Sequence, residues 1–239
     1  AGRGATAPVL TVGEGGGCDL RVAIGPGGPG GATAELAWRG QRQRLTIPVT
    51  GAHNLQNAAL AVAAAVAAGC DFAAAVAALA SFPGVARRME VVGERAGVTV
   101  VDDFAHHPTA LAVTIAAARE RWPGRRLVVA FEPRSLTAAR RDFQGAYLEA
   151  LGDADLVLVA APFHADRLAP DAVLDRRSLA AALAARGVPS LMPEPGADAA
   201  QTLTDALESG DVVLGCSSGD FRGFHQRLLA SLGKEAGND

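Results

Sequence analysis

The sequence predicts an α/β protein whose larger, C-terminal part is a Rossmann-like domain with a mostly parallel sheet. After residue 84, short apolar runs alternate with helical patterns, which is typical of strands joined by crossover helices. The runs lack a strict alternation of apolar and polar residues, as expected for strands buried on both faces. They read MEVV, VTVVDDF, RLVVAFE, DLVLVAAP and DVVLGC, with helical patterns at 109–121 and 136–150.

The first part of the chain predicts a smaller unit of strands followed by two helices. From residue 9 to 50, β-favouring runs alternate with glycine-rich breaks, which indicates antiparallel strands joined by turns. Helices are predicted at about 53–68 and 71–80, before the breaker SFPG. We therefore place the boundary near residues 83–86 and expect domains at 1–85 and 86–239.

Composition argues against several classes of function. The 22 basic residues nearly balance the 25 acidic ones, so no nucleic-acid partner is predicted. The longest apolar run, residues 58–68, is too short to span a bilayer, so no membrane association is predicted. Three widely spaced cysteines without a CxxC pair indicate reduced thiols in a cytoplasmic protein.

A glycine pattern in the first unit imitates a dinucleotide-binding motif. Gly25, Gly27 and Gly30 satisfy GxGxxG directly after a predicted strand. That motif needs a following helix whose amino terminus faces the pyrophosphate, and here prolines and another strand-like run surround the glycines. We expect a hairpin loop and no dinucleotide site, which also weighs against an oxidoreductase.

Two asparagines lie three residues apart at the start of the first alanine-rich helix. Asn54 and Asn57 therefore occupy neighbouring surface positions, and their amides can both donate to and accept from an adenine edge. The alternative is that His53 or Asn54 only caps the helix after the turn at Gly51. Asn57 lies inside the helix, where asparagine is unfavourable, so function is favoured there.

Two further segments place polar residues at the hinge and after the next strand. Arg87 and Arg88 follow the helical unit, where one guanidinium could hold a nucleotide; a solvated charge pair is the alternative. In VVDDFAHHPTA, the strand runs into two aspartates suited to a ribose hydroxyl pair. His106 and His107 come before a helix amino terminus, which favours anions, and adjacent histidines are poorly placed to share a metal ion.

The last two candidate segments repeat this pattern of a buried strand followed by polar residues. In VVAFEPRSLT, Arg134 is suited to bidentate capture of a carboxylate, while Ser135 is either a ligand or a helix cap. In DVVLGCSSGDF, Ser217 and the backbone amides near Gly219 are suited to a carboxylate or phosphate. Cys216 has no histidine tied to it by sequence, so a nucleophilic role is disfavoured.

Taken in order, five motifs resemble the C-terminal half of the Mur ligase family. They are GAHNLQNAALA, FPGVARRME, VDDFAHHPTA, FEPRS and GCSSGDF, and the resemblance spans about residues 45–233. DDFAHHPTA and EPRS make it closest to the murein peptide ligases. The alternatives are the related UDP-N-acetylmuramate–L-alanine ligases and a nucleotide- or peptide-binding module without catalysis.

The resemblance implies a division of the site between two domains. Residues 1–85 would be the C-terminal part of a central ATP-binding domain, and 86–239 the Rossmann-like C-terminal domain. The residues implied in ATP binding are Asn54, Asn57, Arg88 and Asp103, with Asn57 at adenine and Asp103 at the ribose. Those implied on the side of the amino component are His106, His107, Arg134, Ser135 and Ser217.

The resemblance also implies a reaction that this sequence supports only in part. Members of the family use ATP and Mg²⁺ to activate a carboxylate as an acyl phosphate, which an amine then attacks. The implied partners are UDP-N-acetylmuramate and the murein tripeptide L-alanyl-γ-D-glutamyl-meso-diaminopimelate. The sequence has no GxxGK[ST], and Lys234 is its only lysine. We therefore expect a fragment that lacks the N-terminal region of its protein, has no metal or catalytic residues of its own, and is inactive alone.

Overall fold

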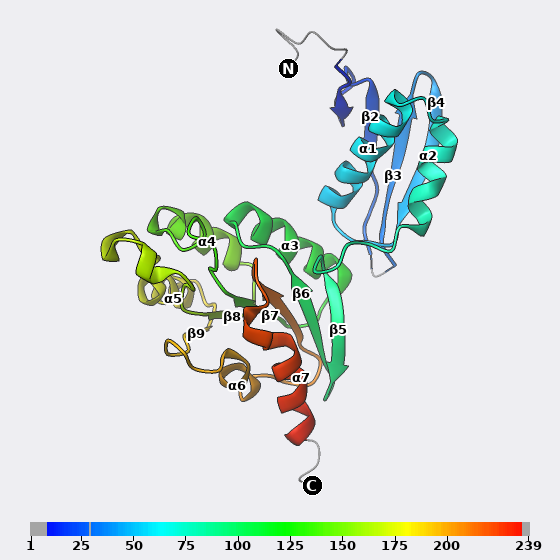
Figure 1. The fold of residues 1–239 in the computed structure, drawn as a ribbon. Helices are drawn as coiled ribbons and strands as arrows, with labels where there is room; N and C mark the ends of the chain where they lie inside the picture. The colour runs from blue at the N-terminus through cyan, green and yellow to red at the C-terminus, as the bar shows by residue number, and fades with distance from the viewer. Residues whose placement is uncertain (1–8, 29, 236–239) are drawn as a thin grey trace. The chain divides into compact units, whose positions relative to one another are not determined.

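The computed structural model describes residues 9–28 and 30–235. The chain divides after Gly84 into two compact units (Figure 1). Within the described residues, no helix combines the length and the apolar character that crossing a membrane requires.

The first unit contains a four-stranded sheet in the order β1-β2-β3-β4. Strands β2, β3 and β4 pair antiparallel, as the sequence predicts. The expectation was wrong for β1, which pairs parallel with β2. The glycine-rich segment 14–18 returns the chain to the level at which β1 begins, so that β2 runs in the same direction as β1. The strands are β1 (Val12–Gly13), β2 (Leu20–Ile24), β3 (Ala32–Trp38) and β4 (Gln41–Ile47).

The GxGxxG segment lies in the loop between β2 and β3. Because these strands pair antiparallel, the loop closes a hairpin, as predicted. The amide of Gly25 donates to the carbonyl of Thr33 at 2.9 Å, and no helix follows the last glycine. The segment therefore lacks the helix amino terminus that a pyrophosphate would need.

Two helices, α1 (Ala52–Ala67) and α2 (Phe72–Ala78), follow the sheet, and a 3₁₀ turn continues α2. Asp71 caps α2 by accepting a hydrogen bond from the amide of Ala74 at 2.9 Å. The inner faces of the helices form one apolar core with the sheet, which includes Leu20, Leu36, Leu45, Leu55, Ala59, Val62, Phe72 and Val76.

The second unit is built on a six-stranded sheet in the order β5-β6-β10-β7-β8-β9. Strand β5 pairs antiparallel at one edge, and all other pairs are parallel, which confirms the predicted fold class. The two-residue strand β9 was not predicted, because it carries no apolar run. The strands are β5 (Glu90–Arg95), β6 (Val98–Asp103), β7 (Leu127–Phe131), β8 (Leu156–Val159), β9 (Ser190–Leu191) and β10 (Val212–Cys216).

Helices cover both faces of this sheet (Figure 1). Helices α3 (Pro108–Arg121), α4 (Gln144–Leu151) and α5 (Arg176–Ala185) share one core with residues such as Val129 and Leu214. Helices α6 (Ala199–Thr204) and α7 (Phe224–Glu235) share the opposite core with Val128 and Val213. Neighbouring residues of one strand thus face different cores, which explains why their sequences are apolar throughout.

The helix predicted at 136–150 is shorter in the structure. Residues 135–139 form a turn, a 3₁₀ turn follows at Arg141–Phe143, and α4 begins only at Gln144. Arg140 interrupts the helical pattern because its backbone is extended and forms an isolated bridge with Val173. This turn keeps the segment after β7 close to the end of its strand.

The core beneath α7 gives a direct test of the fold. Leu228 is fully buried on α7, so Leu228→Ala should lower the free energy of unfolding of the second unit by about 2–5 kcal/mol. Leu136→Ala is the control, because Leu136 is 41% exposed. Urea unfolding can be followed by Trp122 fluorescence in a Trp38→Phe background. Equal effects of the two substitutions would contradict the assigned packing.

Candidate functional site

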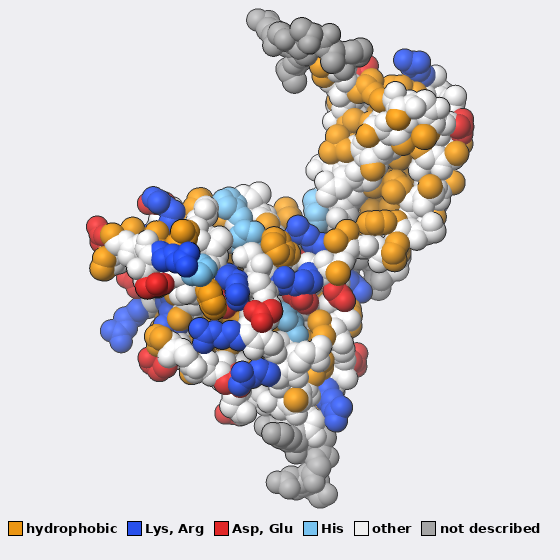
Figure 2. Space-filling view, in the orientation of Figure 1, with side chains coloured by type: hydrophobic (Ala, Val, Ile, Leu, Met, Phe, Trp, Pro, Cys, Tyr) orange, Lys and Arg blue, Asp and Glu red, His pale blue; other side chains and the backbone are white. Residues whose placement is uncertain are grey.

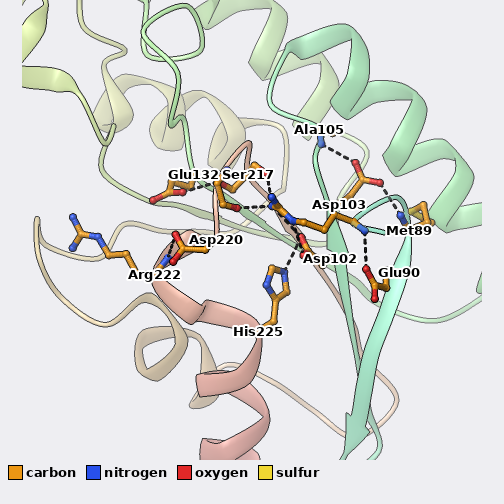
Figure 3. Close-up of polar contacts among 12 residues, drawn as sticks. Met89, Glu90, Asp102, Asp103, Ala105, Glu132, Ser217, Asp220, Arg222 and His225 are labelled. Carbon is orange, nitrogen blue, oxygen red and sulfur yellow. Dashed lines mark hydrogen bonds and ion pairs between the residues drawn. The ribbon is translucent and has the colours of Figure 1, made fainter. Parts of the chain in front are cut away.

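Three neighbouring parallel strands of the second unit end in register. Cys216 at the end of β10 lies between Asp103 of β6 and Phe131 of β7. The amide of Ser217 donates to the carbonyl of Asp103 at 3.1 Å, and that of Glu132 to Cys216 at 3.0 Å. The polar segments that follow the three strands therefore lie side by side, at the edge where ligands gather in α/β sheets (Figure 3).

Asp103 is held inside the protein by backbone amides. Its carboxylate accepts from the amides of Met89 at 2.9 Å and Ala105 at 2.8 Å, and the Thr114 hydroxyl lies 3.4 Å away. The residue is 2% exposed, and burial raises the pKa of its carboxyl group, although these hydrogen bonds oppose the shift. The carboxylate thus ties the segment before β5 to the segment after β6.

Arg87 joins the strand end to the loop after β10. Its guanidinium donates to Asp102 at 2.9 Å, to the carbonyl of Ser217 at 2.8 Å and to the carbonyl of Gly219. The backbone of Arg87 has a φ of 58°, and its amide donates to Glu90 at 2.7 Å. Arg87 and Arg88 lie in a turn before β5, so they are not alternate residues of a strand.

His225 of α7 completes this cluster from the other side. Its Nε2 atom lies 3.6 Å from Asp102 Oδ1, too far for a hydrogen bond, and has no hydrogen-bond partner within the described residues. Burial lowers the pKa of the imidazole, while the charge of Asp102 opposes that change. The ring packs so closely on Gly215 that a Cβ atom there would overlap it.

Glu132 and Ser217 form a buried pair at the ends of β7 and β10. The Ser217 hydroxyl donates to Glu132 Oε2 at 2.6 Å and accepts from the amide of Gly219 at 3.0 Å. Glu132 is 3% exposed and Ser217 is fully buried. Ser217 therefore orders the loop from inside, and direct contact with a substrate would require the loop to rearrange.

Arg134 spreads over the same loop. Its Nη1 lies 3.1 Å from an oxygen of Asp220 and 3.6 Å from Glu132, and its guanidinium stacks 4.0 Å from the centre of the Phe163 ring. A Cβ atom at Gly219 would collide with this guanidinium. Because Arg134 is only half-buried, part of its guanidinium remains available to a carboxylate.

The two predicted histidines take different positions. His106 Nδ1 lies 2.9 Å from the carbonyl of Phe104, whereas His107 is the N-cap residue of α3 without a side-chain cap and packs 5.0 Å from the Phe143 ring. The Tyr147 hydroxyl donates to the carbonyl of His106 at 2.9 Å. Helix α4 thereby fixes the loop that carries both imidazoles.

Ser135 and Asn54 form hydrogen bonds with residues close by in sequence. Ser135 accepts from the amide of Ala138 at 3.0 Å, so it caps a turn and not a helix. In the first unit, Gly51 is the N-cap of α1, which makes the capping interpretation of His53 or Asn54 wrong. Asn54 donates to the carbonyl of Thr50 at 2.7 Å, and Asn57 is exposed one turn further along.

Arg88 and Cys216 complete the set of predicted positions. Arg88 is exposed, and its guanidinium lies 5.3 Å from the centre of the Phe104 ring, so a cation and an aromatic face lie together. The three cysteines are free thiols. Full burial raises the pKa of Cys216, which keeps it protonated and unsuited to act as a nucleophile.

Sequence patterns singled out Arg134 and Ser217 but assigned no role to the acidic residues that contact them. Glu132 and Asp220 are these acidic partners, and Figure 2 shows basic, acidic and histidine side chains gathering on this unit. Glu132 has a sequence signal, because it directly follows the apolar run of β7. No sequence signal pointed to His225, because it reaches Asp102 from a different element.

Asp103 provides a test of this arrangement. In Asp103→Asn one carboxylate oxygen becomes an NH₂ group, so one of two buried amides loses its acceptor. We expect the free energy of unfolding of the second unit to fall by about 1–3 kcal/mol. Asp153→Asn, at an exposed position, should leave it unchanged. Equal unfolding midpoints for both variants by urea titration would contradict the assigned role.

Comparison with curated proteins places relatives over most of the chain. A protein named UDP-N-acetylmuramate–L-alanine ligase from Chloroflexus aggregans is 42% identical over 188 residues, covering 79% of this chain and 39% of the relative. One of the same name from Methylococcus capsulatus is 34% identical over 238 residues, covering 96% and 49%. The chain thus spans less than half the length of these relatives.

Solved structures and a family model agree with the fold. A UDP-N-acetylmuramate–alanine ligase from Thermotoga maritima matches with a TM-score of 0.75 at 22% identity, over 95% of this chain and 48% of that one. A murein peptide ligase from Psychrobacter arcticus matches with a TM-score of 0.67 at 28% identity, over 93% and 46%. The family model described as "Mur ligase, glutamate ligase domain" matches residues 87–219, more than half of the chain. The chain therefore belongs to the Mur ligase family.

Proposed function

We propose that this chain is part of an ATP-dependent ligase that joins UDP-N-acetylmuramate to the amine of the tripeptide L-alanyl-γ-D-glutamyl-meso-diaminopimelate. The proposal rests mainly on the cluster at the ends of β7 and β10. There Glu132 has a buried carboxylate and Arg134 a half-buried guanidinium. Opposite charges at one strand edge suit an amino component that bears both an amine and carboxylates. The EPRS sequence favours the peptide as that component.

A second candidate is the addition of L-alanine to the same nucleotide sugar. The names of the relatives that are 34–42% identical favour it. The murein peptide ligase from Psychrobacter arcticus, at 28% identity, supports the peptide instead. Both reactions form an amide bond from a carboxylate and an amine, so they differ in the acceptor and not in the chemistry.

The residues fit a nucleotide in part. The exposed amide of Asn57 and the exposed guanidinium of Arg88 are suited to a base and to phosphate oxygens, and we also assign Asn54 to the nucleotide side. Asp103 fits less directly, because its carboxylate is 2% exposed and a ribose hydroxyl would need access to it. ATP, bound with Mg²⁺, would supply the phosphoryl group that activates the carboxylate.

On the acceptor side, we assign the residues according to their exposure. Arg134 would bind a carboxylate directly, and His106 and His107 would line the approach to it. Ser135 and Ser217 would act by holding the two loops, because their hydroxyl groups already have partners within the protein. The chain lacks a phosphate-gripping loop, so we propose that it does not ligate by itself and that the protein works in the cytoplasm as a longer chain.

The acceptor is tested with the longer protein that contains this sequence. UDP-N-acetylmuramate, ATP and Mg²⁺ are supplied with either the tripeptide or L-alanine, and ADP and the ligated product are measured. We expect turnover with the tripeptide, and none with the 239-residue chain alone. Turnover with L-alanine but not with the tripeptide would replace the first candidate by the second.

The nucleotide side is tested at an exposed residue, where folding is not at risk. Asn57→Ala should raise the KM for ATP about five- to tenfold, the effect of losing roughly 1–1.4 kcal/mol from one hydrogen bond. The KM for the acceptor should not change. Gln56→Ala, at the exposed neighbouring position, is the control. If both variants bind ATP like the unsubstituted protein, Asn57 has no part in the nucleotide site.

A further inference from the structure

A small cavity opens beside Glu132 at the carboxyl edge of the sheet. Its volume is about 160 Å³, and it lies among the segments that follow β7, β8 and β9 and the start of α7. Whole drug-sized ligands occupy about 300–1,000 Å³, so this cavity suits one end of a molecule and not a nucleotide. The residues that matter for its chemistry are Glu132, Glu194, Asp198, Arg222 and Arg227.

Glu132 is the buried anion of this cavity. It is 3% exposed, and both of its side-chain contacts, with Ser217 and Arg134, are made through the same oxygen, Oε2. Within the described residues, Oε1 has no hydrogen bond. Arg134 lies 3.6 Å away and is itself shared with Asp220 at 3.1 Å, so the charge of Glu132 is only partly balanced. A buried carboxylate with one free oxygen is a receptor for a cation.

Arg222 is a cation that lines the same cavity. Within the part of the chain that the structure describes, Arg222 has no ion-pair partner. The other arginine, Arg227, is bound to Asp198 at 2.5 Å and is therefore neutralised. Arg222 has a φ of 53°, and its guanidinium lies 5.6 Å from the centre of the Phe163 ring. Figure 3 shows its side chain directed away from Asp102 and Asp103. An exposed, unpaired guanidinium is suited to a carboxylate.

We propose that this cavity binds an α-amino-acid end group, with the ammonium at Glu132 Oε1 and the carboxylate at Arg222. The inference rests on the proposed function and deepens it. The end group has two sources, a free amino acid that serves as the acceptor or the distal amino-acid group of a peptide acceptor. Glu194, exposed at the rim, disfavours a second carboxylate there.

The cavity is continuous with the cluster of Glu132, Arg134 and Ser217 at the ends of β7 and β10, which supports this assignment. Glu132 belongs to both, since it lines the cavity and accepts from Ser217. Asp220, which binds Arg134, also accepts from the amide of Arg222 at 3.2 Å. A group bound in the cavity would therefore lie next to the guanidinium of Arg134. These residues position the acceptor. The distal ammonium of a peptide would keep its proton there, whereas the ammonium of a free amino acid must release a proton to solvent before the amine can attack.

The test uses the longer protein and steady-state kinetics. Glu132→Gln preserves an acceptor for Ser217, and Arg222→Gln changes an exposed side chain that packs no core. Each should raise the KM for the amino component about tenfold or more, with the KM for ATP and for UDP-N-acetylmuramate within twofold. Arg186→Gln is the control, since Arg186 is an exposed arginine bound to Glu149 elsewhere.

Acceptors that lack the end carboxylate show which of the two sources supplies the bound group. They also distinguish a lost contact with that carboxylate from a general structural effect of the substitution. The pairs are the tripeptide against its analogue ending in lysine, and L-alanine against L-alaninamide. The Arg222→Gln penalty should be about tenfold for the member with the carboxylate and under twofold for its partner. The pair that shows this difference identifies the source. Equal penalties within both pairs, or no penalty at all, would overturn the proposal.

The same variants can be tested without ligation. Isothermal titration of the 239-residue chain with the acceptor measures binding alone, so it does not depend on the missing phosphate-gripping loop. We expect weaker binding by both variants than by the unsubstituted chain, and unchanged binding by Arg186→Gln. Absence of turnover with either acceptor in the longer protein would overturn the proposed function. Unchanged binding by both cavity variants would overturn the assignment of the cavity.

Discussion

The site depends on three parallel strands that end at the same level. The ladder between β6, β10 and β7 continues one residue beyond Cys216, through the amides of Ser217 and Glu132. These hydrogen bonds fix where each following loop begins, so residues more than 80 positions apart in sequence meet within 2.6 Å. A shift of β6 by one residue in this register would exchange the faces to which Asp102 and Asp103 point and separate the charged groups from their partners.

The strand register places several charged side chains close together. Because the carboxylates are largely buried, each of them needs hydrogen bonds or an ion pair from within the protein. Three acidic groups lie near the strand ends, and each is balanced in a different way: Asp103 by backbone amides, Asp102 by Arg87, and Glu132 by a hydroxyl and a distant guanidinium. The first two arrangements are nearly complete. The third leaves a carboxylate oxygen available, and it is the one that borders a cavity. Incomplete balance of a buried charge is what separates a binding position from a structural one.

Much of the fold could be predicted because apolar runs and breakers are local signals. The parallel strands, α1 and α3 follow from them, whereas β9 and the interrupted helix at 136–150 do not, since a bridge between Arg140 and Val173 shapes the second. Site residues were predicted where they follow a strand, as for Arg134. The roles of Arg87 and His225 could not be predicted, because each depends on a partner from another element, and Arg87 also has a left-handed backbone that no pattern indicated.

The pair of aspartates shows why position alone does not assign a role. Consecutive residues of a strand point to opposite faces, so Asp102 meets His225 of α7 whereas Asp103 meets Thr114 of α3. The two carboxylates therefore cannot approach one ribose together from this strand. Asp102 is held by a guanidinium and Asp103 by two amides, and a hydroxyl group is a weaker partner for a carboxylate than a guanidinium. Of the two, Asp103 has the neutral partners and spare acceptor positions, so a ribose hydroxyl could bind there beside the two amides only if the buried carboxylate became accessible.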